Sequence, residues 1–390
     1  SMAVQRLVLT DFRSYASLRL NIDAPMITLT GANGAGKTNL LEAISFLVPG
    51  RGLRAARLTD IGRREPGNTE SRQRWGVAAT VEGLDGVYEV GTGVSEEMTG
   101  ENPRRAVRIN GAPARGQTAL GERLSALWLT PDMQRLFSEG ASGRRRFLDR
   151  LVFGFDPAHA GRLKAFERAM RERSSLLHRE VTHGTPADPA WLDVLEETIV
   201  EKGVAIAAAR IALIDRLNPA CAMGVGPFPS AHLALDGTLD GWIGTMPAVE
   251  AEDQYRAALV DSRSVDRSGR GAVIGPHRSD LAVTHILKNA PAGQCSTGEQ
   301  KALLISIVLA NARLQSLECG AVPILLLDEI AAHLDEERRE ALFAEIQALG
   351  AQAWMTGTDP SLFAPLSGAA QHFTVANAEV TECSLDAYAA

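Results

Sequence analysis

Alternating apolar and polar positions dominate the first third of the chain. Short runs of β-branched and apolar residues, separated by turn residues, predict a series of β-strands. These runs lie at residues 4–9, 17–22, 26–30, 75–81, 86–94, 106–109 and 126–130. The run at 26–30 leads directly into a glycine-rich segment, after which apolar residues at 39–47 recur at helical spacing. We therefore expect a strand, a glycine-rich loop and a helix in direct succession.

The pattern changes at about residue 142, where apolar residues begin to recur at steps of three and four. This spacing predicts three helices, at residues 142–154, 160–181 and 190–217. Pro219 and the loop after it are expected to end the helical block, because proline interrupts the hydrogen bonds of a helix interior. No heptad survives over several turns, which excludes a long coiled-coil arm. We expect an inserted helical lobe that extends to about residue 265.

Strands and helices alternate again in the last third of the chain. A helix is expected from about residue 297 to residue 317. Residues 322–329 form a continuous apolar run that ends in two acids, which is typical of a strand buried on both faces. A helix at 335–349 and a buried strand at 352–356 follow. The pattern predicts an α/β fold that is interrupted by the helical lobe.

Bulk composition excludes several classes of protein. The 390 residues are 45% hydrophobic and 22% charged, as in ordinary soluble globular proteins. No apolar run approaches the roughly 18 residues that a membrane span needs, and the first ten residues lack the pattern of a signal peptide. The four cysteines are scattered, without the spacing of metal ligands. We therefore expect a cytoplasmic protein with no membrane partner.

The charge is distributed unevenly. The net charge of −7 argues weakly against a nucleic-acid partner. However, residues 141–180 hold ten Arg or Lys against five Asp or Glu, and residues 51–74 hold seven Arg against three acids. A chain that is acidic overall can still present a basic stripe. Solvated helix faces are the alternative, and for any single segment this alternative is favoured.

The glycine-rich segment at 31–38, GANGAGKT, matches the phosphate-binding pattern G-x-x-x-x-G-K-[ST] at every fixed position. Glycines would let backbone N–H groups point at phosphate oxygens, and the start of the following helix favours negative charge. Lys37 is expected to reach the β- and γ-phosphates of a nucleotide, and Thr38 to hold Mg²⁺. The predicted nucleotide-binding residues are Gly31, Ala32, Asn33, Gly34, Ala35, Gly36, Lys37, Thr38 and Asn39.

Two acids and a second helix start complete the candidate chemistry. Asp328 is expected to bind Mg²⁺ beside Thr38, and Glu329 to polarise the attacking water. The segment CSTGEQKALL at 295–304 places Ser296, a hydroxyl, at a helix N-terminus, which suits a γ-phosphate. A plain N-cap with Gln300 in a capping box explains the same residues, and both interpretations can hold.

The order of these motifs resembles the ABC-type ATPase superfamily, and longer stretches resemble the RecF family with its SMC-like relatives. These stretches are LVLTDFRSYASLRLNI, GANGAGKTNLLEAI, LTPDMQRLFSEGASGRRRFLDRLVF and GPHRSDLAV. The resemblance implies an ABC-type ATPase head with an N-terminal antiparallel β part and an inserted helical lobe. Its ATPase lobe would comprise residues 1–140 and 266–390, and its second lobe residues 141–265. His277, Arg278 and Asp280 in the last stretch are interpreted as loop-ordering residues, without assigned chemistry.

For the site, the resemblance implies ATP and Mg²⁺ as cofactors and an ATP-dependent homodimer. The signature segment of one copy would meet the γ-phosphate held by the other. That segment consists of Ser296, Thr297, Gly298, Glu299 and Gln300. Asp335 is either a D-loop residue at the dimer interface or only the N-cap of the next helix. Gln134 would be the Q-loop ligand of Mg²⁺, with Asp132 and Met133 as alternatives, and Arg13 would lie near the adenine.

For function, the resemblance implies a bacterial ATPase of DNA replication and recombinational repair, with weak, DNA-stimulated hydrolysis. Such a protein binds double-stranded and gapped DNA, acts with RecO and RecR to load the RecA recombinase, and supports the SOS response. The candidate DNA contacts are Arg54, Arg57, Arg144 and Arg145, with ion pairing as the alternative. Two other classes are a transport motor with a membrane partner and a scaffold with vestigial hydrolysis. Thr358 or Asp359 stands where a transporter has its switch histidine, which argues against the first.

Overall fold

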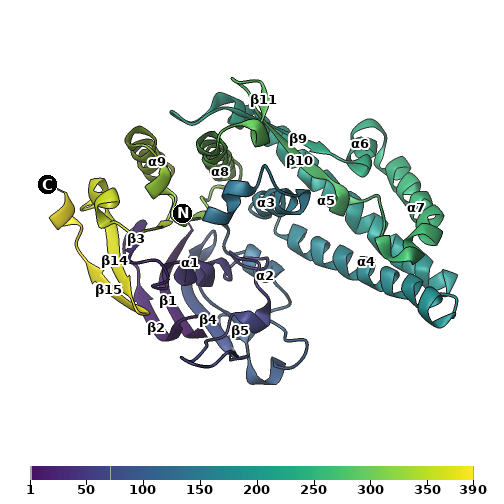
Figure 1. Ribbon diagram of the computed structural model, residues 1–390, viewed down its shortest axis with the longest axis horizontal. Helices are drawn as coiled ribbons and strands as arrows, with labels where there is room; N and C mark the ends of the chain where they lie inside the picture. Colours follow the sequence, from purple (N-terminus) through teal and green to yellow (C-terminus); the bar gives the residue numbers. More distant parts are fainter. Residues whose placement is uncertain (1, 71, 390) are drawn as a thin grey trace. The chain divides into compact units, whose positions relative to one another are not determined.

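The structure, a computed structural model, describes residues 2–70 and 72–389 (Figure 1). The chain divides into two compact units. The first unit contains residues up to 134, residues 223–230 and residues from 296 onward, and the second contains residues 135–222 and 231–295. The first unit therefore joins the two ends of the chain, so that the purple and yellow segments of Figure 1 lie side by side in it.

An antiparallel sheet forms the N-terminal part of the first unit, in the strand order β2-β1-β4-β5-β6-β7. Its strands are β1 (Ala3–Phe12), β2 (Tyr15–Asn21), β4 (Trp75–Gly83), β5 (Gly86–Val94), β6 (Ala106–Ile109) and β7 (Ala112–Pro113). The alternation of the sequence is kept, because Trp75, Val77, Ala79 and Val81 are buried along one face of β4. The predicted antiparallel β part is confirmed.

A second, mostly parallel sheet has the order β15-β14-β3-β13-β12-β8. Its strands are β3 (Met26–Thr30), β8 (Ala126–Leu129), β12 (Ile324–Leu327), β13 (Ala353–Gly357), β14 (Ala370–Ala376) and β15 (Glu379–Cys383). Every residue of β3, β12 and β13 is buried, as expected for strands that are covered on both faces. Only β15 runs antiparallel to its neighbour. The sequence analysis did not identify β14 and β15.

Four helices accompany these sheets: α1 (Lys37–Ser45), α2 (Thr118–Gly121), α8 (Thr297–Cys319) and α9 (Glu336–Leu349). One hydrophobic core joins α1 to both sheets, and Phe12, Phe46 and Trp75 pack their rings within it, with centroids 5.2–6.1 Å apart. Among the described residues, α8 is the one helix long and apolar enough to cross a membrane, but 67% of its apolar stretch is buried. That burial is typical of a core helix.

The second unit is built mainly from α3 (Ala141–Phe153), α4 (Ala158–His183), α5 (Pro189–Met223), α6 (Thr238–Thr245) and α7 (Ala248–Val265). The prediction that Pro219 ends the block is wrong, since α5 continues through it to Met223. Leu217 and Cys221, on either side of the proline, are both fully buried. Packing of that face outweighs the one backbone hydrogen bond that proline removes.

A short antiparallel sheet completes the second unit, with β10 (Asp280–His285) between β9 (Ala231–Asp236) and β11 (Ala290–Pro291). The segment boundaries predicted from the sequence, at residues 140 and 265, stay a proposal. Because β10 pairs with β9 along its whole length, residues 266–295 pack with the second unit. That pairing favours a boundary near residue 295.

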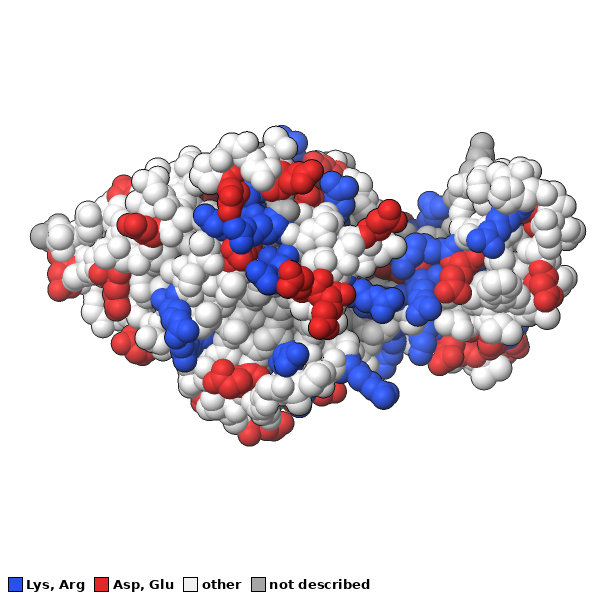
Figure 2. Space-filling view, turned by 90° about the horizontal axis from the view of Figure 1, so that it is seen from below, with Lys and Arg blue, Asp and Glu red and all other residues white. Residues whose placement is uncertain are grey.

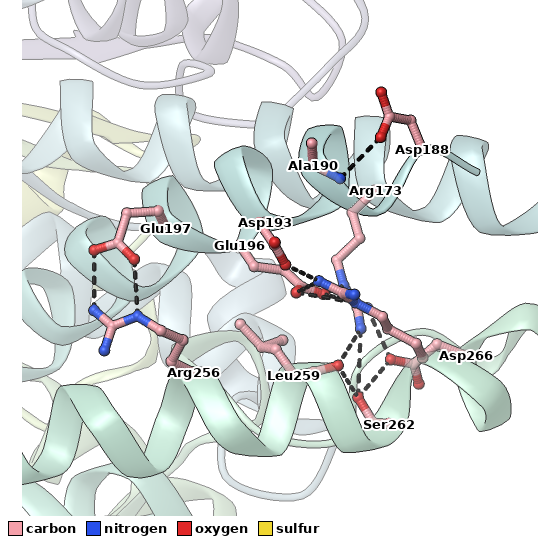
Figure 3. A network of polar contacts seen from close by, with 11 residues as sticks. Arg173, Asp188, Ala190, Asp193, Glu196, Glu197, Arg256, Leu259, Ser262 and Asp266 are labelled. Atoms are coloured by element: carbon pink, nitrogen blue, oxygen red, sulfur yellow. Dashed lines mark hydrogen bonds and ion pairs between the residues drawn. The ribbon is translucent and has the colours of Figure 1, made fainter.

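Buried ion pairs connect the helices of the second unit (Figure 3). Arg173 of α4 is 1% exposed and donates hydrogen bonds to Glu196 of α5, to Asp266 and to the carbonyl oxygen of Leu259 of α7, at 2.7–2.8 Å. Arg263 of α7 also donates to Glu196. A charged group is stable in such a place only when it is paired and hydrogen-bonded. This network holds α4, α5 and α7 in register.

Candidate nucleotide-binding site

The order of the parallel strands brings the two ends of the chain to one edge of the sheet. β13 lies between β3 and β12 and runs parallel to both. The loop 31–36 follows β3, and Asp328 and Glu329 follow β12. The carboxyl ends of parallel strands form a common edge, which is where ligands bind in open α/β sheets. The loop and the acids, about 290 residues apart in sequence, therefore meet.

Two glycines of the loop need their missing side chains. Gly36 has φ 112°, and a Cβ there would lie 2.7 Å from the Tyr15 hydroxyl oxygen. A Cβ on Gly31 would lie 2.1 Å from the carbonyl oxygen of Val375 in β14. The Tyr15 hydroxyl donates a hydrogen bond to the carbonyl oxygen of Gly36 at 2.9 Å. The antiparallel sheet thus fixes the loop just before α1 begins.

Lys37 is the buried centre of the site. Its side chain is 4% exposed, and its Nζ lies 2.6 Å from the carbonyl oxygen of Gly31, 3.0 Å from that of Gly357 and 3.1 Å from Oε1 of Glu329. The three donors of an ammonium group are therefore all engaged. The predicted catalytic pair of Lys37 and Glu329 lies in direct contact.

Asp328 lies against two hydroxyl groups. The Thr38 Oγ1 is 3.1 Å from both carboxylate oxygens, and the Thr356 hydroxyl donates to Oδ1 at 2.7 Å. Burial raises the pKa of Asp328, while the hydrogen bonds from Thr356 and Thr38 act in the opposite direction. A carboxylate and a hydroxyl at this spacing are the oxygen ligands that Mg²⁺ takes from a protein beside a phosphate chain. Thr38 and Asp328 therefore fit the metal predicted from the sequence.

The predicted signature segment forms the first turn of α8. Ser296 is its N-cap, and the Ser296 hydroxyl accepts a hydrogen bond from the N–H of Glu299. The capping partner is thus Glu299 and not Gln300, because the third helical position after Ser296 is residue 299. Thr297 and Gly298 fill the two positions between them. The N-cap interpretation of Ser296 is confirmed, and its binding of phosphate stays a prediction.

The start of α8 is tied to α9. Glu299 forms an ion pair with Arg338 at 2.9 Å, and the N–H of Arg338 donates to Oδ1 of Asp335 at 2.8 Å. Asp335 is therefore the N-cap of α9, as one of the two interpretations of the sequence stated. Its place at a dimer interface stays a prediction.

Other predicted residues lie around α1 and after β8. Arg13 holds Glu42 of α1 with two hydrogen bonds at 2.7 and 3.1 Å. Arg54 donates to Oδ1 of Asn39 at 3.0 Å and to the same Glu42 at 3.2 Å. Arg54 therefore lies beside Asn39, one of the predicted nucleotide-binding residues. Gln134 lies in a short 3₁₀ helix that follows β8.

The remaining candidate DNA contacts take part in ion pairs or in contacts with the backbone. Arg57, whose side chain is 84% exposed, forms a weak pair with Asp60. Arg144 holds Asp280 with two hydrogen bonds at 2.7 and 3.1 Å, and Arg145 donates to the carbonyl oxygen of Ser279. Burial is the main cause that lowers the pKa of Arg145. The ion-pair alternative is confirmed for Arg57, Arg144 and also Arg54.

Sequence reasoning missed Thr356 and Tyr15. Thr356 belongs to the segment MTGTD, where we considered only Thr358 and Asp359. A hydroxyl at the end of a buried strand was a usable signal, because it must find a hydrogen-bond partner. Tyr15 had no such signal, since its partner Gly36 is reached only through the tertiary fold.

These features define an ATPase head of the ABC and SMC type, with a phosphate-binding loop and paired acids on one sheet edge. The family model described as the RecF/RecN/SMC N-terminal domain matches residues 3–378. The DNA replication and repair protein RecF of Rhizobium etli (strain CIAT 652) is 49% identical over 385 residues, covering 97% of this chain and 98% of that protein. The protein of the same name from Mesorhizobium japonicum is 49% identical over 379 residues, covering 95% and 96%. The chain belongs to the RecF family.

Solved structures share the fold. A structure of the recombination mediator protein RecF-ATP in the RecFOR pathway has a TM-score of 0.80, at 20% identity, and covers 98% of this chain and 99% of that one. The Smc head domain of Pyrococcus furiosus with an extended coiled coil, bound to the C-terminal domain of ScpA, has a TM-score of 0.54, at 17% identity. It covers 99% of this chain and 98% of that one. The predicted fold class is confirmed.

Proposed function

We propose that this protein is an ATP-dependent DNA-binding protein of recombinational repair, in which ATP joins two copies into a dimer. The observation that carries the proposal is the convergence of Lys37, Thr38, Asp328 and Glu329 within hydrogen-bond distance. The relatives named DNA replication and repair protein RecF support the DNA-related role. The structural neighbour RecF-ATP supports ATP as the nucleotide.

In this proposal the contacts of Lys37 change when a nucleotide binds. Phosphate oxygens take the place of Glu329 and of the backbone carbonyl oxygens around Nζ, because a phosphate is a strong partner for an ammonium group. Glu329, now 3.1 Å from Nζ, is then free to accept a proton from the attacking water. Thr38, Asp328 and Gln134 would hold Mg²⁺, which neutralises charge on the phosphates. Arg13, Arg54 and Asn39 would form the rim of the site.

Dimer formation would complete the site. The helix start at Ser296 presents free N–H groups and a hydroxyl, which suit the γ-phosphate bound by the second copy. The other residues of the signature segment would take part in the same contact: Thr297, Gly298, Glu299 and Gln300. The ion pair of Glu299 with Arg338 would transmit the contact to Asp335 and α9. Hydrolysis by Glu329 would then separate the two copies.

DNA would be bound through its backbone. Contacts of this kind are insensitive to sequence and weaken with salt. Figure 2 shows one face of the molecule, on which Lys and Arg side chains lie in groups beside Asp and Glu side chains. We take single exposed arginines as the candidates. Arg57 is the best of the four, because Arg144 and Arg145 are bound internally. The same proposal includes binding of gapped DNA, action with RecO and RecR to load RecA, and support of the SOS response.

The test compares two site variants with the unaltered protein. Lys37→Ala should lose nucleotide binding, and Glu329→Gln should form a stable dimer that retains duplex DNA in the presence of ATP and Mg²⁺. Lys288→Ala, at an exposed position of the second unit, is the control and should behave as the unaltered protein. Light scattering gives the mass with and without ATP and then with duplex DNA. A Glu329→Gln variant that stays monomeric with ATP would refute the scheme.

DNA-stimulated turnover separates the proposed function from the alternatives. Duplex DNA should raise the rate of the unaltered protein, since binding of DNA and closure of the dimer favour each other. A transport motor has no reason to respond to DNA, and a scaffold with vestigial hydrolysis shows no turnover to stimulate. Turnover that stays constant over a titration with duplex DNA would contradict the proposal.

A further inference from the structure

Thr356 joins the two acids of the site. It lies near the end of β13, its side chain is 1% exposed, and no motif of the chain includes it. Its hydroxyl donates to Oδ1 of Asp328 at 2.7 Å and accepts a hydrogen bond from the backbone N–H of Glu329 at 2.9 Å. A hydroxyl has one proton to donate, so this group serves both neighbours with its donor and one acceptor position.

The contact with Glu329 explains an unusual backbone conformation. Glu329 has φ 56°, in the left-handed region that residues other than glycine rarely adopt. Such a conformation persists only where the surroundings enforce it, and it is common at active sites. The hydrogen bond to Thr356 fixes the N–H of this residue, so that its carboxylate reaches Nζ of Lys37.

The hydroxyl of Thr356 reaches Asp328 from a residue that is not itself a proposed metal ligand. Thr38 also lies against Asp328, but Thr38 is itself expected to bind Mg²⁺. Thr356 reaches Asp328 from the neighbouring strand and contacts neither Lys37 nor the loop through any recorded hydrogen bond of the described residues. It is therefore placed to orient the carboxylate before and after the ion arrives.

We propose that Thr356 is a positioning residue, which orients Asp328 toward Mg²⁺ and holds Glu329 in its left-handed conformation through a single hydroxyl group. The inference rests on the proposed function, because it assigns to that same site a residue that links metal binding to hydrolysis. It predicts that the hydroxyl, and not the size of the side chain, is the feature that matters.

Three substitutions at the position separate the hydroxyl from the volume. Thr356→Val keeps the shape and removes the hydroxyl, Thr356→Ser keeps the hydroxyl, and Thr356→Ala differs from Thr356→Ser by that group alone. Thr92→Val is the matched control, because Thr92 is also buried in a strand and donates one hydrogen bond, to the carbonyl oxygen of Ala106.

Two measurements report the effect. The affinity for a fluorescent ADP analogue is determined with EDTA and with Mg²⁺, and steady-state hydrolysis gives kcat and KM. Thr356→Val should keep the affinity in EDTA, lose most of the gain from Mg²⁺ and lower kcat about tenfold, the usual effect of removing one hydrogen bond to a charged group. Thr356→Ser should stay within about threefold of the unaltered protein. Thr92→Val should change neither quantity.

Each outcome decides the matter. A Thr356→Val variant with unaltered Mg²⁺ dependence and kcat would overturn the proposal, as would a Thr356→Ser variant as impaired as Thr356→Val. If Thr356→Val does not fold, the pair of Thr356→Ser and Thr356→Ala gives the same comparison. The variant Lys37→Ala distinguishes failure of this inference from failure of the proposed function. If that variant still binds nucleotide, the function is wrong, whereas an inactive Lys37→Ala beside a normal Thr356→Val refutes the inference alone.

Discussion

Two arginines of the second unit make similar numbers of hydrogen bonds, four for Arg173 and three for Arg256, but differ in burial. This difference allows a test of what stabilises the helices of the unit (Figure 3). Arg173 is 1% exposed, and its partners include two carboxylates that are equally buried. The side chain of Arg256 is 36% exposed and pairs with Glu197 and Asp253 at 2.8–3.0 Å. The pKa of Arg256 is raised, first by its hydrogen bond to Glu197. Solvent screening nevertheless limits what such a pair contributes to stability.

The expected magnitudes follow from what each substitution leaves behind. Arg173→Met keeps the apolar part of the side chain but leaves Glu196 and Asp266 buried without their main partner. Breaking a buried pair in this way costs about 3–5 kcal/mol. The lower end of that range applies here, because Glu196 keeps Arg263 and Asp266 keeps the hydroxyl of Ser262. Arg256→Met should cost at most about 1 kcal/mol.

Hydrogen exchange is the appropriate assay, because two compact units need not unfold together. Protection of the backbone amides of α4, α5 and α7 reports the opening of the second unit, while amides of β3 and β12 provide an internal reference. Arg173→Met should lower the free energy of opening in these helices by about 3 kcal/mol and leave the reference strands unchanged. Equal losses for Arg173→Met and Arg256→Met would refute the reasoning, since bond number rather than burial would then set stability.

Three further predictions concern the loop, pH and DNA. Gly36→Ala should lower nucleotide affinity at least about tenfold more than Gly34→Ala. Both glycines have positive φ, but an added Cβ meets other atoms within 4 Å only at Gly36, nearest the Tyr15 hydroxyl oxygen at 2.7 Å. Equal affinities in a titration would contradict this. Burial lowers the pKa of His277 to about 4 from 6.5. The unfolded state therefore binds more protons between these values, so stability should decrease as the pH is lowered from 6.5 to about 4. Unfolding followed by circular dichroism should show this decrease, and a smaller one in His277→Gln. Arg57→Ala should reduce the slope of log affinity for duplex DNA against log salt concentration by about one. Arg144→Ala should instead destabilise the second unit. An unchanged slope for Arg57→Ala would show that Arg57 does not contact DNA.

The elements that the sequence predicted well are those set by local pattern. The strands at β3 and β12 and the loop between β3 and α1 were placed closely. A short β-branched and apolar run followed by glycine, or a continuous apolar run followed by acids, leaves few alternatives. α5 was cut short at Pro219, since local propensity gives no information about the packing that carries the helix onward. β9 was missed because its alternating pattern gains meaning only when β10 pairs with it.

The same division holds at the site. Lys37 and Thr38 were predicted from a motif with fixed spacing, and Asp328 and Glu329 from an apolar run that ends in two acids and is paired with that motif. The structure brings these four residues together. Thr356 and Tyr15 act through hydrogen bonds between strands or across sheets, so their partners depend on the strand order and not on any nearby residue. The arginines show the reverse problem. Their number allowed either a basic stripe or ion-paired faces, and each of the four binds a neighbouring acid or carbonyl oxygen.

The position of β3 has a consequence for the order in which the chain folds as it is synthesised. Both neighbours of this strand, β13 and β14, come from residues 353–376, so β3 has no strand to pair with while it leaves the ribosome. The antiparallel sheet pairs strands from the first 113 residues alone and can form early. A nascent chain halted before residue 353 would therefore expose a strand that is fully buried in the complete fold, beside the predicted phosphate-binding loop. Binding of nucleotide has to wait for nearly complete translation.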